Sequence, residues 1–240
     1  HNGKKISAKR SIINLKKKKW RVKDKKEKFL SHKETDTPNP TNFYGLSKLY
    51  QENIVKQCAE DLDISYTILR YSIVQGSRQS FFNSYSGLCR NLISSYLKNE
   101  RPIIFEDGNS TRDFINISDV TQINSRILNN EKAFNQTFNV GGGKKYSLLN
   151  FDKIVRKKLN TKIYPIKDRY FRINDPRYNI SNISKIKRML NWKPKNEIEI
   201  SIQDYIKWIN KYKKYLKYSK SGLKKMIRQG VVIDCNKSTF

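Results

Sequence analysis

A helical pattern that leads directly into a buried strand is the feature that most constrains the fold of this chain. Less polar side chains recur at helical spacing across residues 42–61, just after a turn cluster rich in proline and asparagine. Residues 64–74 are then rich in branched and aromatic side chains and close at Gly76, which is typical of a buried strand. A helix followed by a buried strand is the alternation of an α/β sheet.

The same alternation continues toward the C-terminus. Patterns and turn residues predict helices near 86–99, 118–129, 147–159, 182–190 and 199–218, with strands over 101–108 and from 138 into the glycine loop 141–143. Residues 1–33 lack this periodicity, and we interpret them as a loop or an irregular insertion. The sequence therefore predicts an α/β fold, and it contains no visible internal repeat.

Composition argues against several classes of protein. No run approaches the roughly 18 consecutive apolar residues of a membrane span, and the first thirty residues are lysine-rich instead of apolar. We therefore expect a cytoplasmic protein with no membrane contact. The three cysteines, Cys58, Cys89 and Cys235, are scattered along the chain, which predicts a reducing compartment, no disulfide framework and no structural metal.

The net charge of +29 gathers at the two ends of the chain. Residues 1–33 carry 14 basic and 2 acidic side chains, and residues 211–228 carry 8 basic and no acidic side chains. A nucleic-acid binder would spread its charge along a groove and show a zinc-finger or RNP motif, and this sequence shows neither. An abundance of Lys together with many Ile and Asn residues is also typical of proteins from a genome with a biased base composition. We therefore expect no nucleic-acid partner; steeply salt-dependent binding is the observation that would favour one.

Tyr44 and Lys48 form a Y-x-x-x-K pair at the start of the first predicted helix. Four residues make just over one helical turn, so both side chains project from the same face. A neighbouring ammonium favours the phenolate form of a tyrosine, which is a usable base for an alcohol proton. The spacing alone favours the plainer interpretation of a solvated helical face, so the context of the pair decides.

Five segments, in order, resemble one family. Residues 38–52 resemble the Tyr/Lys helix of the extended short-chain dehydrogenase/reductases that act on nucleotide sugars. The other four are the strand and loop 69–76, the R-D-F-x-x-x-x-D-V element 111–120, the glycine loop 138–143, and the helix and Trp-Lys-Pro turn 182–194. The matches cover about residues 37–216, which makes coincidence improbable.

This resemblance implies a specific domain organisation. The fold class is α/β, as the C-terminal part of a Rossmann-type doubly wound parallel sheet plus a small mixed α/β substrate-binding domain. We expect a basic insertion or irregular segment over 1–36, the remaining NAD-binding domain over 37–76, and a mainly nucleotide-sugar-binding part over 77–218. Residues 111–140 would return to the first domain, and 219–240 would be a basic tail.

The resemblance also implies that an N-terminal part is missing. The G-x-x-G-x-x-G loop that seats the cofactor pyrophosphate does not occur in the sequence, and the catalytic Ser or Thr would lie just upstream of His1. Met189 and Met226 are the only methionines, so His1 is not an ordinary start. We expect a truncated chain that folds poorly by itself, binds NAD weakly and is inactive alone.

Catalytic and cofactor-binding roles follow from the resemblance. Tyr44 would be the base that takes the sugar hydroxyl proton, and Lys48 would be its partner and bind the nicotinamide ribose of NAD. Tyr71 would lie near the nicotinamide, and an ordinary core tyrosine at a strand end is the alternative interpretation. Ile73 stands where the family usually has Asn, which puts that substrate contact in doubt.

The substrate would be a nucleotide-diphosphate sugar. Arg112 and Arg172 match positions that contact the phosphates, for which the arginine fork is well suited. Asp175 matches the carboxylate that accepts from ribose hydroxyls, and Asn83 falls in the substrate segment. For each of the four, a surface salt bridge or a loop cap is the alternative interpretation.

The implied activity is NAD-dependent epimerisation of a nucleotide sugar at C4, through a keto sugar that receives the hydride on its other face. More narrowly, residues 79–87 and 104–108 resemble the substrate segment of dTDP-L-rhamnose 4-epimerases. A dehydratase or another epimerase of the family is an alternative, and so is an inactive fragment. Members of the family commonly pair through the Tyr/Lys helix, so we expect a homodimer when the protein is complete.

Overall fold

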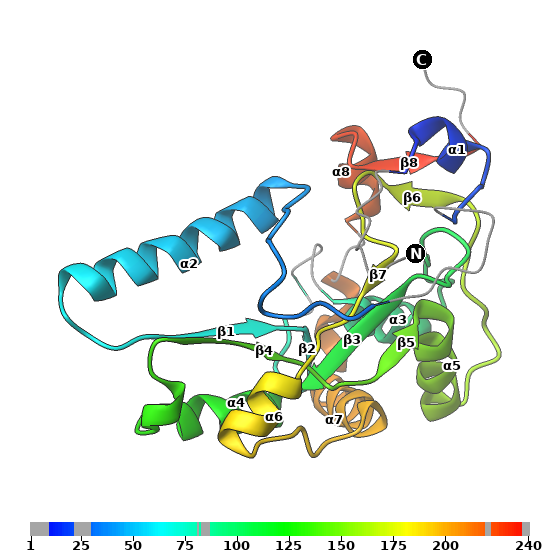
Figure 1. Ribbon diagram of the computed structural model, residues 1–240. Helices are drawn as coiled ribbons and strands as arrows, with labels where there is room; N and C mark the ends of the chain where they lie inside the picture. The colour runs from blue at the N-terminus through cyan, green and yellow to red at the C-terminus, as the bar shows by residue number, and fades with distance from the viewer. Residues whose placement is uncertain (1–9, 22–29, 81, 83–86, 219–221, 237–240) are drawn as a thin grey trace.

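Two pairs of parallel strands form the centre of the fold. The computed structural model describes residues 10–21, 30–80, 82, 87–218 and 222–236 (Figure 1). Strand β1 (Thr67–Tyr71) pairs in parallel with β4 (Gln136–Val140), and β2 (Ile73–Gln75) pairs in parallel with β3 (Thr111–Asn116). Only Ser72 separates β1 from β2, so one run of chain passes from the first pair to the second. This arrangement confirms the predicted α/β fold class.

Short strands extend this centre. β5 (Lys145–Ser147) is antiparallel to β3, and β7 (Tyr178–Asn179) is parallel to β3. β6 (Tyr170–Arg172) and β8 (Val232–Asp234) form a separate antiparallel pair. Helices α1 (Ile12–Lys16) and α8 (Leu223–Arg228) lie beside that pair at one end of the molecule (Figure 1).

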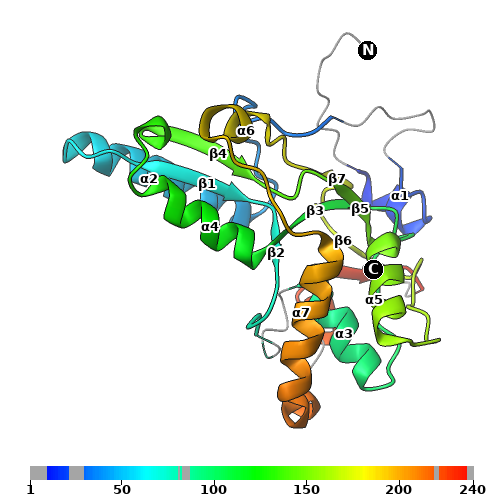
Figure 2. The same cartoon turned by 90° about the horizontal axis from the view of Figure 1, so that it is seen from below.

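Two apolar cores hold the other helices in place. The larger core lies among α3 (Leu88–Leu97), α5 (Leu148–Leu159) and α7 (Ile198–Lys211), which gather on one side (Figure 2). The second core joins α4 (Ile117–Ile127) and α6 (Ser184–Leu190) to β4. Two short 3-10 helices, Glu131–Ala133 and Lys213–Tyr218, complete the secondary structure described.

Helix α2 (Phe43–Asp61) is set apart from both cores. The Asn42 side chain caps it by accepting from the Gly45 amide at 2.8 Å. It lies on the opposite side of the β1–β4 pair from α4 and α6 (Figure 1). Ala59 is its one buried residue, and its larger apolar side chains, Phe43, Tyr44, Leu46, Tyr50, Ile54 and Val55, are exposed.

The predicted helices are confirmed, with α7 ending earlier and continuing as a 3-10 turn. The predicted strand at 101–108 is wrong, since only an isolated bridge between Ile103 and Ile166 forms there. Pro102 has no amide hydrogen to donate, and Glu106 has a positive φ of 58°, so neither fits a continuous strand. Strand β3 was not predicted, because the charged residues Arg112 and Asp113 interrupt the apolar pattern that is typical of a buried strand. The strand is nevertheless almost wholly buried.

The segments expected to be irregular contain ordered elements. The predicted insertion includes α1, whose Leu15 is buried beside Phe171. The predicted basic tail includes α8 and β8, where Met226 and Val232 are buried among exposed lysines. No helix within the described ranges has the length and apolar character needed to cross a membrane.

Candidate functional site

The Tyr44 and Lys48 side chains meet on the first turns of α2. The Lys48 ammonium lies 5.5 Å from the centroid of the Tyr44 ring, as the four-residue spacing predicts. Lys48 also donates to Oε1 of Gln51 at 3.1 Å. The Tyr44 side chain is 73% exposed, so its hydroxyl is open to an incoming ligand.

Tyr71 points away from this pair. Its hydroxyl donates to Oδ1 of Asn124 at 2.9 Å, and Asn124 belongs to α4, on the side of the β1–β4 pair opposite α2. Burial raises the pKa of Tyr71, and the hydrogen bond to Asn124 opposes this only in part. The structure therefore does not bring Tyr71 together with Tyr44 and Lys48.

Arg112 and Asp175 lie in direct contact, although 63 positions separate them in the sequence. Nη2 of Arg112, on β3, lies 2.7 Å from Oδ2 of Asp175, in the loop after β6. Their side chains are 10% and 30% exposed. The Arg112 guanidinium also donates to the carbonyl oxygen of Thr111 at 2.9 Å, so its position is fixed from two sides.

Arg172 is held without a carboxylate. Its Nη2 donates to the sulfur of Met226 at 3.2 Å, and its guanidinium lies 5.2 Å from the centroid of the Phe105 ring. Its Nε is buried and has no hydrogen-bond partner among the residues that the structure describes. Within the described part of the chain, no Asp or Glu forms an ion pair with Arg172.

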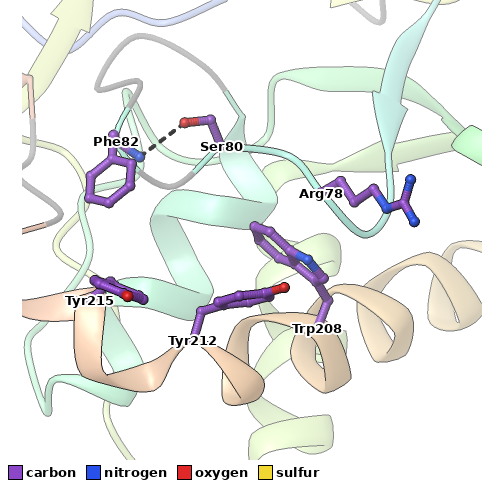
Figure 3. Close-up of a pocket in the computed structure, with 6 residues that line it drawn as sticks. All are labelled: Arg78, Ser80, Phe82, Trp208, Tyr212 and Tyr215. Atoms are coloured by element: carbon purple, nitrogen blue, oxygen red, sulfur yellow. Dashed lines mark hydrogen bonds between the residues drawn. The ribbon is translucent and has the colours of Figure 1, made fainter.

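Asn83, the remaining predicted substrate residue, lies outside the described residues. The hollow that the structure does describe near that segment measures about 310 Å³ and is lined by side chains from two places (Figure 3). Four of the six lining side chains are aromatic, and none of the six is a predicted site residue. The six are Arg78, Ser80, Phe82, Trp208, Tyr212 and Tyr215. Among the described side chains, no group of three or more His, Cys, Asp or Glu is arranged to hold a metal ion.

A buried charge network behind Arg112 was not predicted. Arg177 Nη1 lies 2.7 Å from Glu106 Oε2 and 2.6 Å from Asp107 Oδ1. Burial by itself would raise the pKa of Asp107, but hydrogen bonds from Arg177 and Asn109 outweigh it and hold the pKa at about 2. Burial would also lower the pKa of Arg177, yet its two carboxylate partners raise it.

One sequence feature could have pointed to this network. A second arginine, Arg177, follows Asp175 and a proline, in a loop that already carries Arg172. Its acidic partners, Glu106 and Asp107, stand about 70 positions earlier, in the segment with the resemblance at 104–108. Without coordinates, nothing paired the two segments.

The glycine loop after β4 wraps closely around Asp113. Gly142 donates its amide to Oδ1 of Asp113 at 3.0 Å, and a Cβ on Gly141 would lie 2.1 Å from Oδ2. Ser72 donates to the same carboxylate at 2.9 Å. Burial nevertheless raises the pKa of Asp113 to about 6. The glycines thus allow the loop to pack closely on β3.

Comparisons with known proteins place this geometry in context. Residues 23–141 match the sequence model of the family described as NAD dependent epimerase/dehydratase. A putative UDP-glucose 4-epimerase of Methanocaldococcus jannaschii is 35% identical over 175 residues, covering 71% of this chain and 54% of that protein. The dTDP-L-rhamnose 4-epimerase of Burkholderia thailandensis is 33% identical over 174 residues, covering 72% and 47%. The chain therefore spans about half the length of the curated relatives it matches.

Solved structures agree in fold. The UDP-glucose 4-epimerase of Thermotoga maritima, solved with UDP-glucose, matches with a TM-score of 0.70 and 27% identity, over 78% of this chain and 59% of that one. A UDP-glucuronic acid 4-epimerase of Bacillus cereus, solved with UDP-glucuronic acid and NAD, matches with a TM-score of 0.69 and 25% identity. That match covers 78% of this chain and 58% of that one.

Proposed function

This chain belongs to the NAD-dependent epimerase/dehydratase family, and we propose that it carries the Tyr/Lys pair and the substrate-binding part of a nucleotide-sugar 4-epimerase. The observation that carries this proposal is that Arg172 forms no ion pair with any Asp or Glu of the described residues. Its positive charge is therefore available to a bound anion. Arg172 stands three residues from Asp175, the partner of Arg112, so one diphosphate would meet both arginines.

We propose a separate role for each of these side chains on the basis of its contacts. Arginine forks bind diphosphate oxygens through paired N–H groups, which suits Arg112 and Arg172. Asp175 accepts from Arg112 through Oδ2. Within the described residues, no hydrogen bond involves its other carboxylate oxygen, Oδ1. That oxygen would accept from a ribose hydroxyl of the nucleotide. Asn83 is proposed to contact the sugar, in line with the resemblance of its segment.

At the reacting end of the sugar, the pair on α2 would handle the proton. The Tyr44 oxygen takes the proton of the C4 hydroxyl and returns it after the keto sugar has turned over. Lys48 places a positive charge beside the ring, which stabilises the negative charge of the phenolate. NAD, when bound, supplies the hydride acceptor and donor for C4.

The two side chains present on α2 fit the nicotinamide end of NAD. Both project from one exposed face, and the Lys48 ammonium has N–H groups to donate to ribose hydroxyls. Tyr71 is not included in this cofactor site, because its hydroxyl is engaged by Asn124.

Two substrates are supported by specific observations. The relative named dTDP-L-rhamnose 4-epimerase and the resemblance of residues 104–108 favour dTDP-L-rhamnose. The relative named as a putative UDP-glucose 4-epimerase favours UDP-glucose. We propose dTDP-L-rhamnose first, because Glu106 and Asp107 of that segment shape the network beside Arg112.

A homodimer through α2 is part of the proposal. Pairing through the Tyr/Lys helix requires apolar side chains on its surface, and Leu46, Tyr50, Ile54 and Val55 of α2 are exposed. Burying such side chains between two copies would be favourable, at about 25 cal/mol per Å² of apolar surface. A cytoplasmic location likewise stays a prediction.

Nucleotide binding and turnover test the proposal separately. Calorimetry with dTDP and UDP should detect binding, and Arg172→Met should weaken it about tenfold or more, because one charged donor is lost. Turnover is expected only when the cofactor loop, which this sequence does not contain, is supplied by joining the chain to the N-terminal half of a relative. With NAD, that fusion should convert dTDP-L-rhamnose or UDP-glucose to the C4 epimer, detected by proton NMR. Tyr44→Phe should reduce turnover at least about a hundredfold without weakening nucleotide binding.

Tyr50→Phe is the matched control, since Tyr50 is another exposed tyrosine of α2. Its turnover should equal that of the unmodified chain. Nucleotide binding without turnover would reduce the proposal to a binding function. Absence of nucleotide binding at millimolar dTDP and UDP would overturn it.

A further inference from the structure

One arginine of the basic N-terminal segment reaches the network beside Arg112. The Arg10 side chain is only 9% exposed, and its Nη1 lies 2.7 Å from Oε1 of Glu106. Its Nη2 donates to the carbonyl oxygen of Asp175 at 2.7 Å. Arg10 therefore touches both a carboxylate of the network and the backbone of the residue that pairs with Arg112.

The backbone conformation and the burial of Glu106 both cost free energy, which its contacts must offset. Its φ is 58°, in the left-handed region that costs a side-chain-bearing residue roughly 1–2 kcal/mol, and its side chain is 2% exposed. Arg10 pairs with one carboxylate oxygen, and Arg177 pairs with the other at 2.7 Å. A buried carboxylate that lost one of these cations would be strongly destabilised.

Packing, not charge, seats the segment that carries Arg10. Trp20 is 6% exposed, its ring centroid lies 6.1 Å from that of Phe171, and its Nε1 donates to Oδ1 of Asp168 at 3.1 Å. Phe171 is the neighbour of Arg172 on β6. Lys17, Lys18 and Lys19 are exposed, whereas the Arg10 side chain is only 9% exposed.

The formal charges of the network sum to zero only when Arg10 is included. It joins three guanidinium groups, those of Arg10, Arg112 and Arg177, to three carboxylates, those of Glu106, Asp107 and Asp175. Without Arg10, one negative charge would be left beside the place proposed for a diphosphate. Such a charge repels phosphate strongly where the surroundings exclude water.

We infer that Arg10 is a positioning residue for nucleotide-diphosphate binding: it neutralises Glu106 and holds the backbone of Asp175 so that Arg112 can meet the phosphates. This inference rests on the proposed function for its ligand, but the placement of Asp175 by Arg10 does not. It also gives the basic segment a role inside the protein, as part of the wall of the candidate site.

Calorimetry of the full chain with dTDP and UDP tests the inference. Arg10→Met should weaken the affinity for both about tenfold, because it leaves the Glu106 charge unopposed. Adding Glu106→Gln to Arg10→Met should restore most of the loss, since both charges are then removed. Arg10→Lys should fall between, because it keeps the charge and loses one donor. Lys17→Met removes the same charge from the exposed part of the segment and should change nothing.

A purely structural role for Arg10 would show a different pattern, because the double substitution would then bind no better than Arg10→Met. That result would overturn the inference, as would an unchanged affinity in Arg10→Met. Amide hydrogen exchange over residues 172–177 provides a test without ligand. Exchange should be faster in Arg10→Met than in Lys17→Met. Faster exchange in a chain that binds no nucleotide would support the positioning and overturn only the proposed function; unchanged exchange would overturn the positioning.

Discussion

The two groups of candidate site residues lie in opposite surroundings. Tyr44 and Lys48 stand on α2, a helix of 19 residues with one buried side chain, whereas Arg112 and Asp175 adjoin a buried network of paired charges. The residues proposed to contact the phosphates are thus held in position by contacts within the described chain. The proposed catalytic pair is accessible, but its helix has little packing to fix it. Binding and turnover should therefore depend on different parts of the fold.

Thiol reactivity offers the largest expected difference between the two regions. Cys58 on α2 is exposed, while Cys89 in the larger core is fully buried, and burial raises the pKa of the Cys89 thiol far above its usual value. A disulfide reagent should modify Cys58 at least about a thousandfold faster, because Cys89 reacts only when the core opens. Mass spectrometry of timed samples measures both rates.

Cys58→Ser is the control, since it should remove the fast reaction alone. A slow reaction at Cys58 in the unmodified chain would mean that α2 is covered in solution. In that case the apolar face of α2 would not be exposed in solution, and the contrast between the two regions would fail.

Unfolding by urea should separate the regions by several kcal/mol. Arg177→Met leaves Glu106 with Arg10 alone and Asp107 without its main cation, so we expect a loss of about 3–5 kcal/mol in the free energy of unfolding. In the monomeric chain, Ile54→Ala, on the exposed face of α2, should cost less than about 0.5 kcal/mol. Equal losses would show that α2 is as well packed as the network.

The extent of sequence-based prediction differs between the same two regions. Helix α2 and the strand after it follow from local periodicity, and the Tyr44–Lys48 contact follows from a spacing of one turn. Arg112 and Asp175 were found through the resemblance of their segments, although nothing in the sequence states that they touch. Local pattern was sufficient wherever the interacting residues lie within one element.

Prediction ended where partners lie far apart in the chain. The contact of Arg10 with the Asp175 carbonyl spans 165 positions, and the Arg177–Glu106 pair spans 71. Ion pairs of this kind are decided by how segments pack and not by the composition of either segment. The many lysines of its segment give the sequence the pattern of a solvated charge run, and nothing in that pattern separates the buried Arg10 from the exposed Lys17, Lys18 and Lys19.

Stability should also depend on pH through Asp113. Its pKa is raised from 3.8 to about 6, so the folded state binds a proton more tightly than the unfolded state between these values. The contribution to stability is therefore complete below about pH 4 and is lost as the pH rises through 6. A shift of this size corresponds to up to about 3 kcal/mol. Urea unfolding between pH 4 and 7 measures the slope.

Asp113→Asn should abolish that part of the slope, whereas Asp61→Asn, at the exposed end of α2, should leave it unchanged. Asp107 acts in the opposite sense, because its pKa is lowered to about 2. Its contribution is present above about pH 4 and is lost as the pH falls toward 2. A slope between pH 4 and 6 that survives in Asp113→Asn would assign it to another group.

The smallest expected effect concerns the contact that attaches α2 to β1. Arg70 donates through Nε and Nη2 to the two carboxylate oxygens of Glu52, at 2.8 and 2.6 Å, and the two side chains are 27% and 17% exposed. Such a paired, half-buried contact should give a coupling of about 1 kcal/mol in a double-mutant cycle of Arg70→Met and Glu52→Gln. The exposed pair Lys144–Glu197, at 2.7 Å, is the matched control and should give less than about 0.5 kcal/mol. Equal couplings would mean that α2 is anchored by other contacts, and the proposed catalytic pair would then be held more firmly than the single buried Ala59 suggests.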